Sequence, residues 1–494
     1  RSQHLVPVRP DDLCLDPWIE RSERRVLVQL LVIPRCRCVL DVHRGDVVTR
    51  QVTRQNVLDR PALPGGSRLR SRALGADNSF RPTLLLRDDG RMQIAAGANF
   101  SRVRPGSPFP SNESDPALFQ FTLDGLDDAT FSADGLADAD ELDGRDFSGG
   151  YADAVRQPDG KLVLTARLGI QGGFANVDSA VLRLNADGSR DDSFGSDGGV
   201  TLPKPLPAGE VGSLLGLAVQ ADGRIVGIGS ITQTTGQSIG YFLARFNADG
   251  TLDDGSISDS SPGDSFGTAD TDGVNGVVLN RSAAAFALSA SGYRVRVQGT
   301  RIVVIDTTDA VNEVRLFGHA ANGALDAGFG TGGVVQDIRG DGFCIRPDLL
   351  VQPDQKLLFT AECVIGRLNA NGSPDTTFGG DGFVFRDANN QRELTSDLAV
   401  TATKWLVLQP DGKFLTGGTT SDDVTHVARF YADGLPDTGF GDDRVILPLA
   451  GSPIFGGLAV DSLGAVLIGN IDNRVSGNTS LELARLCGGA SVDT

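Results

Sequence analysis

Oxygen-bearing side chains gather around a glycine in the segment "NADGSRDD", residues 185–192. Four of them carry the hard oxygen ligands that Ca²⁺ takes in proteins: Asn185, Asp187, Asp191 and Asp192. Their spacing partly matches calcium loops of the Asp-x-Asp-x-Asp-Gly type, but the first acidic position and the late bidentate Glu are missing. The pattern therefore favours Asx turns, in which such side chains bond nearby backbone amides, and calcium is the sharpest chemical hypothesis for these four residues.

Other motifs that could do chemistry are scarce. The segment "GDSFG" (263–267) superficially matches the Gly-Asp-Ser nucleophile motif of some esterases, but it coincides with a corner that the chain repeats elsewhere. The sequence has no Gly-rich phosphate loop and no zinc-spaced Cys/His cluster. Only four His occur, of which we interpret His319 and His426 as structural or surface residues. We assign no catalytic residue and no cofactor beyond the calcium hypothesis.

The corner belongs to a repeat whose most visible mark is Asp-x-x-Phe. Its Phe residues recur every 49 to 72 residues, at positions 80, 131, 194, 266, 329, 378 and 440. A second signature lies between the corners and is best seen in "QPDGK" at 157–161 and 409–413. A third, such as "RLNADG" at 183–188, precedes most corners, so each unit carries three motifs in a fixed order.

Short apolar runs separate these motifs, such as "LLGLAVQ" (214–220), "RIVGIGS" (224–230) and "YFLARFN" (241–247). Runs of this length bounded by Asp-Gly turns are typical of β-strands in hairpins. Four strands repeated seven times predict an all-β fold, a seven-bladed β-propeller of four-stranded antiparallel blades. A parallel β-solenoid is the competing architecture, and the Asp-Gly hairpins inside each unit argue against it.

Three structural roles follow from this fold. Gly188 supplies a positive φ in a hairpin turn, and Phe194 is expected to wedge between adjacent blades. Arg183 and Asp191 have counterparts in several units, which a repeated blade architecture explains better than a single catalytic site. Because the last unit stops after its third run at 481–489, we expect the two ends of the chain to pair in one composite blade that closes the ring.

At these motifs the chain resembles the Delta-60 repeat family, whose consensus looks like "QPDGKILVGG…RLNADGSLDTSFG". The segments "QPDGKFLTGG" (409–418) and "RLNANGSPDTTFGGDGFV" (367–384) match it closely, and the resemblance spans roughly residues 75–487. It implies a β-propeller-like bacterial protein that is secreted or at the cell surface, and it brings no defined catalytic residues. The chain departs from the pattern at 298–301, 461–465 and near 255–263.

Charge divides the chain into two parts. Residues 1–72 contain 14 Arg and no Lys against 8 Asp and Glu, which is a net charge of +6. Because the whole chain has a net charge of −18, the remainder carries −24. We expect an Arg-rich N-terminal segment at 1–72 that is disordered or not native, with a basic binding arm as the alternative, followed by the propeller at 73–490. The acidic body disfavours nucleic acid as a partner.

No apolar run is long enough to span a membrane, and no signal peptide is visible. Cys344 and Cys363 form either a disulfide or two buried thiols.

Ligand binding is the default function of such a ring, because loops at one end converge on the central channel. We expect an exported or cell-surface binding module for a protein or carbohydrate ligand, with long loops at 100–116, 167–178, 231–240, 255–275 and 385–402. Trp405 and Tyr241 are the rare aromatics that could stack on a sugar, with blade packing as the alternative for both. The alternative function is an enzyme, a lyase or hydrolase, with a non-repeated cluster of His, Asp, Glu or Tyr at one end of the channel.

Overall fold

The computed structural model describes residues 31–32, 39–40 and, with gaps, 68–486. The gaps lie at residues 76–81, 103–110, 123–124, 140, 143–144, 169–177, 203–205, 207–208, 236, 256–265, 268–274, 282–292, 309–312, 340–346, 362–363, 386–404, 420–424, 441–443, 448–452, 462–463 and 476–477. Cys344, Cys363 and most of the Arg-rich segment therefore lie outside the described residues. Within that segment two short strands pair with each other, β1 (Leu31–Val32) and β2 (Val39–Leu40).

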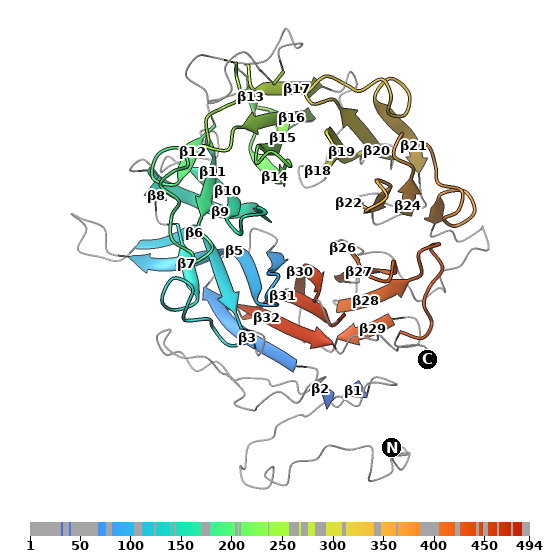
Figure 1. The fold of residues 1–494 in the computed structure, drawn as a ribbon. Helices are drawn as coiled ribbons and strands as arrows, with labels where there is room; N and C mark the ends of the chain where they lie inside the picture. The colour runs from blue at the N-terminus through green and yellow to red at the C-terminus, as the bar shows by residue number, and fades with distance from the viewer. Residues whose placement is uncertain are drawn as a thin grey trace, which may run out of the picture.

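Regular structure in the described ranges consists of β-strands arranged as antiparallel sheets around a ring (Figure 1). The innermost strands are β4 (Thr83–Leu86), β9 (Arg145–Arg156), β14 (Leu214–Val219), β18 (Arg294–Gln298), β22 (Asp348–Val351), β26 (Trp405–Leu408) and β30 (Pro453–Val460). The second strands are β5 (Met92–Arg102), β10 (Leu162–Leu168), β15 (Ile225–Gln233), β19 (Arg301–Thr308), β23 (Leu357–Ala361), β27 (Phe414–Thr419) and β31 (Val466–Val475).

The third strands are β6 (Ser111–Phe121), β11 (Asp178–Leu184), β16 (Ser238–Phe246), β20 (Glu313–His319), β24 (Val364–Leu368), β28 (Thr425–Phe430) and β32 (Asn478–Leu486). The outer strands are β7 (Leu136–Asp138), β12 (Gly199–Thr201), β17 (Val277–Arg281), β21 (Val334–Arg339), β25 (Phe383–Phe385), β29 (Arg444–Leu447) and β3 (Arg68–Gly75). Two short strands extend these sheets, β8 (Glu141–Leu142) beside β9 and β13 (Glu210–Val211) beside β15. The predicted all-β propeller with four-stranded antiparallel blades is confirmed.

The blades close into a ring. Each innermost strand contacts the innermost strand of the next blade, in order from β4 to β30, and β30 contacts β4 in turn. Within the described residues, six blades are built from consecutive strands, and one further sheet joins the two ends of the chain. Six blades rather than the predicted seven are thus built from consecutive strands, because the further sheet takes its strands from both ends of the chain.

The composite sheet has the strand order β3-β32-β31-β30, so its outer strand comes from the start of the chain. β3 pairs antiparallel with β32, with Arg68 opposite Arg485 and Arg72 opposite Leu481. This pairing confirms the expected closure between the two ends. It also places Arg68 to Arg72 in the ring, before the domain boundary expected at residue 73.

The hydrophobic core lies between blades. Phe194 is completely buried in a cluster that joins Val163 and Val181 of one blade to strands β14 to β17 of the next. Its ring faces Gly250, whose φ is +92°, and a Cβ added at Gly250 would come within 3.1 Å of it. Phe131 meets Gly188 in the same way one blade earlier. The predicted wedge is thus confirmed. Five corner residues fill the space beside a glycine in the next blade: Phe131, Phe194, Phe266, Phe329 and Phe378.

The two ends of the ring differ in character. In an antiparallel meander successive connections alternate between opposite ends. The "QPDGK"-type turns and the Asp-x-x-Phe corners therefore share one end, which we call the turn end. The connections into the innermost strands share the other, which we call the entry end. Two of the predicted long loops are shorter than expected. β5 ends only at Arg102 and β6 already begins at Ser111, and residues 234–237 alone separate β15 from β16.

A chain that begins at residue 76 lacks β3 and leaves β32 as an unpaired edge. We expect it to melt roughly 5 °C or more below the full chain and to self-associate, because exposed edge strands pair with other chains. Melting followed by circular dichroism and size-exclusion chromatography would measure both effects. A chain that begins at residue 68 keeps β3 and is the control, and equal melting temperatures for the two shortened chains would contradict the closing role of β3.

Candidate functional site

Asn185 and Asp187 lie in the turn between β11 and β12, at the turn end. The Asp187 carboxylate accepts hydrogen bonds from the Ser189 hydroxyl at 2.7 Å and the Ser189 backbone N–H at 3.0 Å. These bonds lower the pKa of Asp187. Asn185 donates to the Ser189 hydroxyl and to the Arg190 carbonyl, each at 3.0 Å. Both side chains make the contacts of an Asx turn.

Asp191 lies at the start of the corner and binds two cations. Its Oδ2 atom is 2.6 Å from Arg183 Nε and 2.8 Å from Lys161 Nζ, and its Oδ1 accepts the Ser193 hydroxyl at 2.6 Å. Burial raises the pKa of Asp191, but the hydrogen bonds from Lys161, Ser193 and Arg183 outweigh burial and hold the pKa well below its usual range. Asp192 is exposed to solvent.

This arrangement recurs around the ring. Equivalent pairs join Arg367 to Asp375 at 2.6 Å and Arg429 to Asp437 at 2.8 Å. The guanidinium also covers the corner Phe, with Arg183 Cζ 4.5 Å from the centre of the Phe194 ring. The predicted interpretation of Arg183 and Asp191 as blade architecture is supported by this repetition.

The same arginine ties each blade to the next. Arg183 donates to the Ala248 carbonyl in the following blade, and Arg367 donates to the Ala432 carbonyl in its own following blade. A backbone bond runs beside it, from Gly195 N–H to the Asp249 carbonyl at 2.8 Å. We call the Arg–Asp pair, the corner Phe and the carbonyl of the next blade the blade lock.

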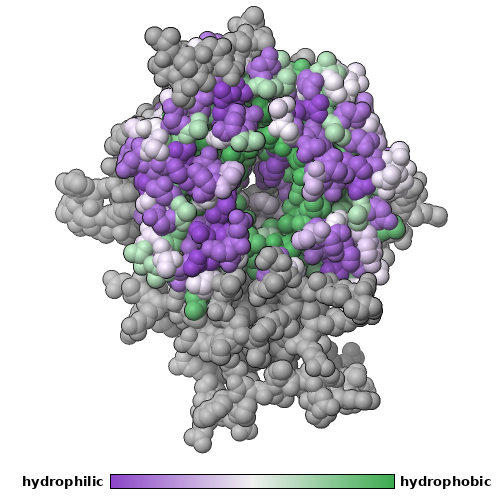
Figure 2. All heavy atoms as spheres, in the orientation of Figure 1, coloured by the Kyte–Doolittle hydropathy of each residue, from purple (hydrophilic) through white to green (hydrophobic). Residues whose placement is uncertain are grey.

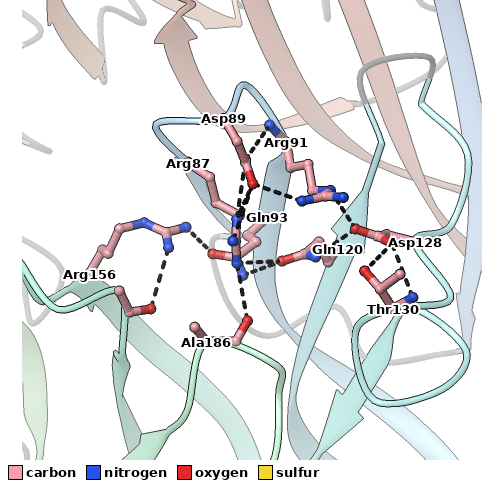
Figure 3. Close-up of polar contacts among 10 residues, drawn as sticks. Arg87, Asp89, Arg91, Gln93, Gln120, Asp128, Thr130, Arg156 and Ala186 are labelled. Atoms are coloured by element: carbon pink, nitrogen blue, oxygen red, sulfur yellow. Dashed lines mark hydrogen bonds and ion pairs between the residues drawn. The ribbon is translucent and has the colours of Figure 1, made fainter.

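Two blades assemble the lock from other residues. In the first blade, Gln120 stands at the arginine position, so Arg91 pairs with Asp128 at 2.8 Å and Arg87 donates to the Ala186 carbonyl at 3.1 Å (Figure 3). In the fourth, Gly318 stands there, and Arg301 from β19 pairs with Asp326 at 2.7 Å and donates to the Ala370 carbonyl at 2.6 Å. The contact to the next blade is kept although the residue that makes it changes.

No three His, Cys, Asp or Glu side chains within the described ranges come together as metal ligands. The oxygens of Asp187 and Asp191 are occupied by the turn and by the two cations described above. The calcium hypothesis at Asn185, Asp187, Asp191 and Asp192 stays a prediction, and its test is given below.

The entry end holds a different set of side chains. The strand registers place one residue from each innermost strand at an equivalent position, four residues before the residue that opens the "QPDGK"-type turn. These positions, the entry ring, are Thr83, Asp153, Gly216, Arg294, Asp348, Trp405 and Gly457. The next residue of each strand is apolar throughout: Leu84, Ala154, Leu217, Val295, Leu349, Leu406 and Leu458. All seven innermost strands therefore carry an apolar residue directly after the entry ring, whereas the residue type in the entry ring itself differs from strand to strand.

The two aspartates of the entry ring fasten neighbouring blades. Asp153 Oδ2 accepts the Leu217 N–H of the next blade at 2.9 Å, and Asp348 Oδ2 accepts the Leu406 N–H of its next blade at 2.9 Å. Each also accepts the N–H of the residue that follows it. Burial raises the pKa of Asp153, and the charges of Arg294 and Arg296 act against burial.

Arg294 lies beside Trp405 in the entry ring. Arg294 Cζ lies 5.9 Å from the centre of the Trp405 ring, and Arg294 Nη1 donates to the Tyr293 carbonyl at 2.9 Å. Arg296, two residues along β18, reaches Asp348 Oδ1 at 3.3 Å. Both Arg294 and Trp405 are partly exposed. Together they form an aromatic and cationic pair at the entry end.

Tyr241, the other aromatic expected to stack on a ligand, is only 1 % exposed. Its hydroxyl is 2.7 Å from His319 Nε2 and accepts from Asn280 Nδ2 at 3.0 Å. His319 Nδ1 lies 2.7 Å from the Gly323 carbonyl, so Nδ1 carries the proton and Nε2 accepts from Tyr241. Tyr241 and His319 therefore pack between two blades, which is the alternative stated for Tyr241, and they are unavailable to a ligand.

Sequence reasoning singled out Trp405 but missed Asp153, Arg294 and Asp348. The signal was present in the repeat, because each residue stands four positions before the Gln of the second signature. The contrast between a position that varies and a neighbour that is always apolar is visible only when the units are aligned on that Gln.

Fold and lock together define a β-propeller repeat protein. The family described as "Domain of unknown function (DUF5122) beta-propeller" matches residues 157–194, 220–255, 364–378 and 409–440. These ranges fall in four blades whose third strand carries the arginine of an Arg–Asp pair near its end. The match supports a β-propeller repeat family.

A search of the curated proteins finds no match. Solved structures with a similar fold include a glucose dehydrogenase, with TM-score 0.36 and 12% identity over 85% of this chain and 99% of that one. Prolyl oligopeptidase B from Galerina marginata has TM-score 0.40 and 9% identity over 82% of this chain and 49% of that one. Porphyromonas gingivalis dipeptidyl peptidase 4 has TM-score 0.33 and 8% identity over 78% and 50%. This chain thus spans about half the length of the two peptidases. No helix in the described residues has the length and apolar character needed to cross a membrane.

Calcium added after a chelator is expected to leave the melting temperature of the protein unchanged. A ligand raises stability only if it binds the native state, and the Asp187 and Asp191 oxygens already accept hydrogen bonds. Differential scanning fluorimetry would measure the shift. A rise that disappears in Asp187→Asn and Asp192→Asn, but persists in the control Asp159→Asn, would instead assign calcium to the predicted residues.

The buried His319 predicts a loss of stability in acid. Burial lowers the pKa of His319 in the native state. As the pH falls below about 6.5, the unfolded chain takes up a proton that the native state takes up only at lower pH, so the free energy of unfolding decreases. We expect His319→Gln to flatten the pH dependence between pH 7 and 5 in urea titrations, while His43→Gln leaves it unchanged. An unaltered slope in His319→Gln would contradict the assignment.

Proposed function

We propose that this chain is an exported or cell-surface bacterial binding module of Delta-60 type. In this proposal its seven blades, with the composite sheet counted as one, present a carbohydrate site at the entry end. Trp405 stacks on a sugar ring, and the polar residues of the entry ring meet its hydroxyl groups. The observation that carries the proposal is the contrast between the entry ring, where the blades differ, and the rest of the repeat, where they agree.

The surroundings of Trp405 support this assignment. A pyranose presents C–H groups on its faces and hydroxyl groups around its edge, so it suits an aromatic face flanked by hydrogen-bonding side chains. Trp405 is partly exposed on β26, and Arg294, which is also partly exposed, comes from β18. The ring is hollow at its centre in Figure 2, with hydrophobic residues along part of the wall.

The enzyme alternative, a lyase or hydrolase, rests on Asp153, a carboxylate at the channel whose pKa burial raises. Its two oxygens accept the Ala154 and Leu217 amides. Asp348 accepts two amides in the same manner. An equivalent contact in two blades favours fastening over proton transfer, which supports the binding module. Turnover of a saccharide that Asp153→Asn abolishes, without loss of binding, would favour the enzyme.

Trp405 fluorescence provides the test of the binding proposal. The sequence has two Trp residues, so Trp18→Phe leaves Trp405 as the only indole. Titration of this variant with a panel of neutral tetrasaccharides is expected to shift its emission for at least one of them. Trp405→Ala should weaken that binding about tenfold in calorimetry, the order of magnitude of a lost aromatic contact.

Two controls keep this test decisive. Trp405→Phe retains an aromatic face and should keep part of the affinity, and circular dichroism shows whether either variant has lost its fold. Binding that Trp405→Ala leaves unchanged, or binding of peptides with no response to any saccharide, would contradict the proposal.

A further inference from the structure

Arg294 differs from the other charged groups at the entry end in what balances its charge. Asp153 and Asp348 each accept two backbone amides, and Arg296 reaches Asp348 at 3.3 Å. Arg294 forms no ion pair among the residues that the structure describes. Its contacts there are one hydrogen bond to the Tyr293 carbonyl and the Trp405 face. Most donors of its guanidinium therefore stay available to a ligand.

Beyond the entry ring most innermost strands carry apolar residues, several of which pack in the clusters between blades. Two residues further along each innermost strand, six of the blades carry an apolar side chain: Leu85, Val155, Ala218, Leu350, Val407 and Ala459. Only the blade of Arg294 carries a charge at that level, and the charge is again a guanidinium, that of Arg296. Charges interact more strongly beside apolar walls than in open water, so an anion gains most at this side of the ring.

The distance between Arg294 and Trp405 limits the shape of the anion. With the guanidinium carbon 5.9 Å from the centre of the indole ring, one ligand reaches both only if its charge lies close to its stacking face. A hexuronate meets this requirement because its carboxylate is bonded directly to the pyranose ring. The planar guanidinium also matches a carboxylate in two-point hydrogen bonding.

We propose that the ligand is an acidic saccharide, a uronic acid oligomer, whose carboxylate binds Arg294 while its ring stacks on Trp405. This inference rests on the proposed carbohydrate site and names its ligand class. Arg294 then selects for charge, and Trp405 supplies affinity for the ring.

The test compares trigalacturonate with its methyl ester, in which each carboxylate charge is replaced by a neutral methoxycarbonyl group. In the Trp18→Phe protein we expect trigalacturonate to shift Trp405 emission and to bind about tenfold or more tightly than the ester. Arg294→Gln should remove this preference by weakening only the acid, and Arg294→Lys should retain part of it. Arg190→Gln, at the turn end, is the matched control and should change neither affinity.

The outcomes separate this inference from the binding proposal. Equal binding of acid and ester, with no effect of Arg294→Gln, would overturn the inference and leave the carbohydrate site at Trp405 intact. Absence of binding by both probes would also overturn it, and the neutral tetrasaccharide panel would then decide the binding proposal on its own. If Arg294→Gln fails to fold, Arg294→Lys with the acid and ester pair still gives the comparison: a reduced preference for the acid would support the inference, and a ratio unchanged from the parent would overturn it.

Discussion

The ring depends on one contact, in which the guanidinium of one blade reaches a backbone carbonyl of the next. Arg183 holds this carbonyl while its charge is balanced by Asp191 and its flat face covers Phe194. A buried ion pair by itself is weak evidence for stability, because both charges lose their hydration. Here the pair also satisfies an orphan carbonyl and shields the inter-blade core, so its geometry fixes how adjacent blades meet. Blades that lack the arginine recover the contact with Arg87 or Arg301, which shows that the carbonyl must be satisfied whichever residue does it.

This requirement divides the molecule by end. The polar residues and glycines of the turn end have structural roles, since they cap turns, bind Arg or Lys side chains, or make room for a corner Phe. The entry end is freer, because the innermost strands need only an apolar second residue to pack. Their first residues can therefore differ from blade to blade, and two of the aspartates found there still serve the ring by binding the neighbouring blade. Arg294 remains as a charged side chain that forms no ion pair among the described residues.

The fold was predictable because its signals are local and repeated. Asp-Gly turns, alternating runs and the Asp-x-x-Phe corner recur often enough to define the blade, the role of Phe194 and the pairing of the two ends. The candidate site was predictable only in part. Trp405 stood out as a rare residue type, whereas Asp153 and Arg294 are common types whose meaning depends on register between strands that the sequence does not display. Tyr241 is also a rare residue type, but its role is structural, since its hydroxyl hydrogen-bonds to His319 between two blades.

The composite sheet also sets the order in which the molecule can form. β3 leaves the ribosome before any complete blade, yet its partner β32 is made about four hundred residues later. A contact of such long separation forms slowly, because the closure entropy of the whole intervening chain must be overcome first. Until then the newly made protein is an open arc with unpaired strands at both ends. Its risk of aggregation is therefore concentrated in the interval before the first strand meets the last.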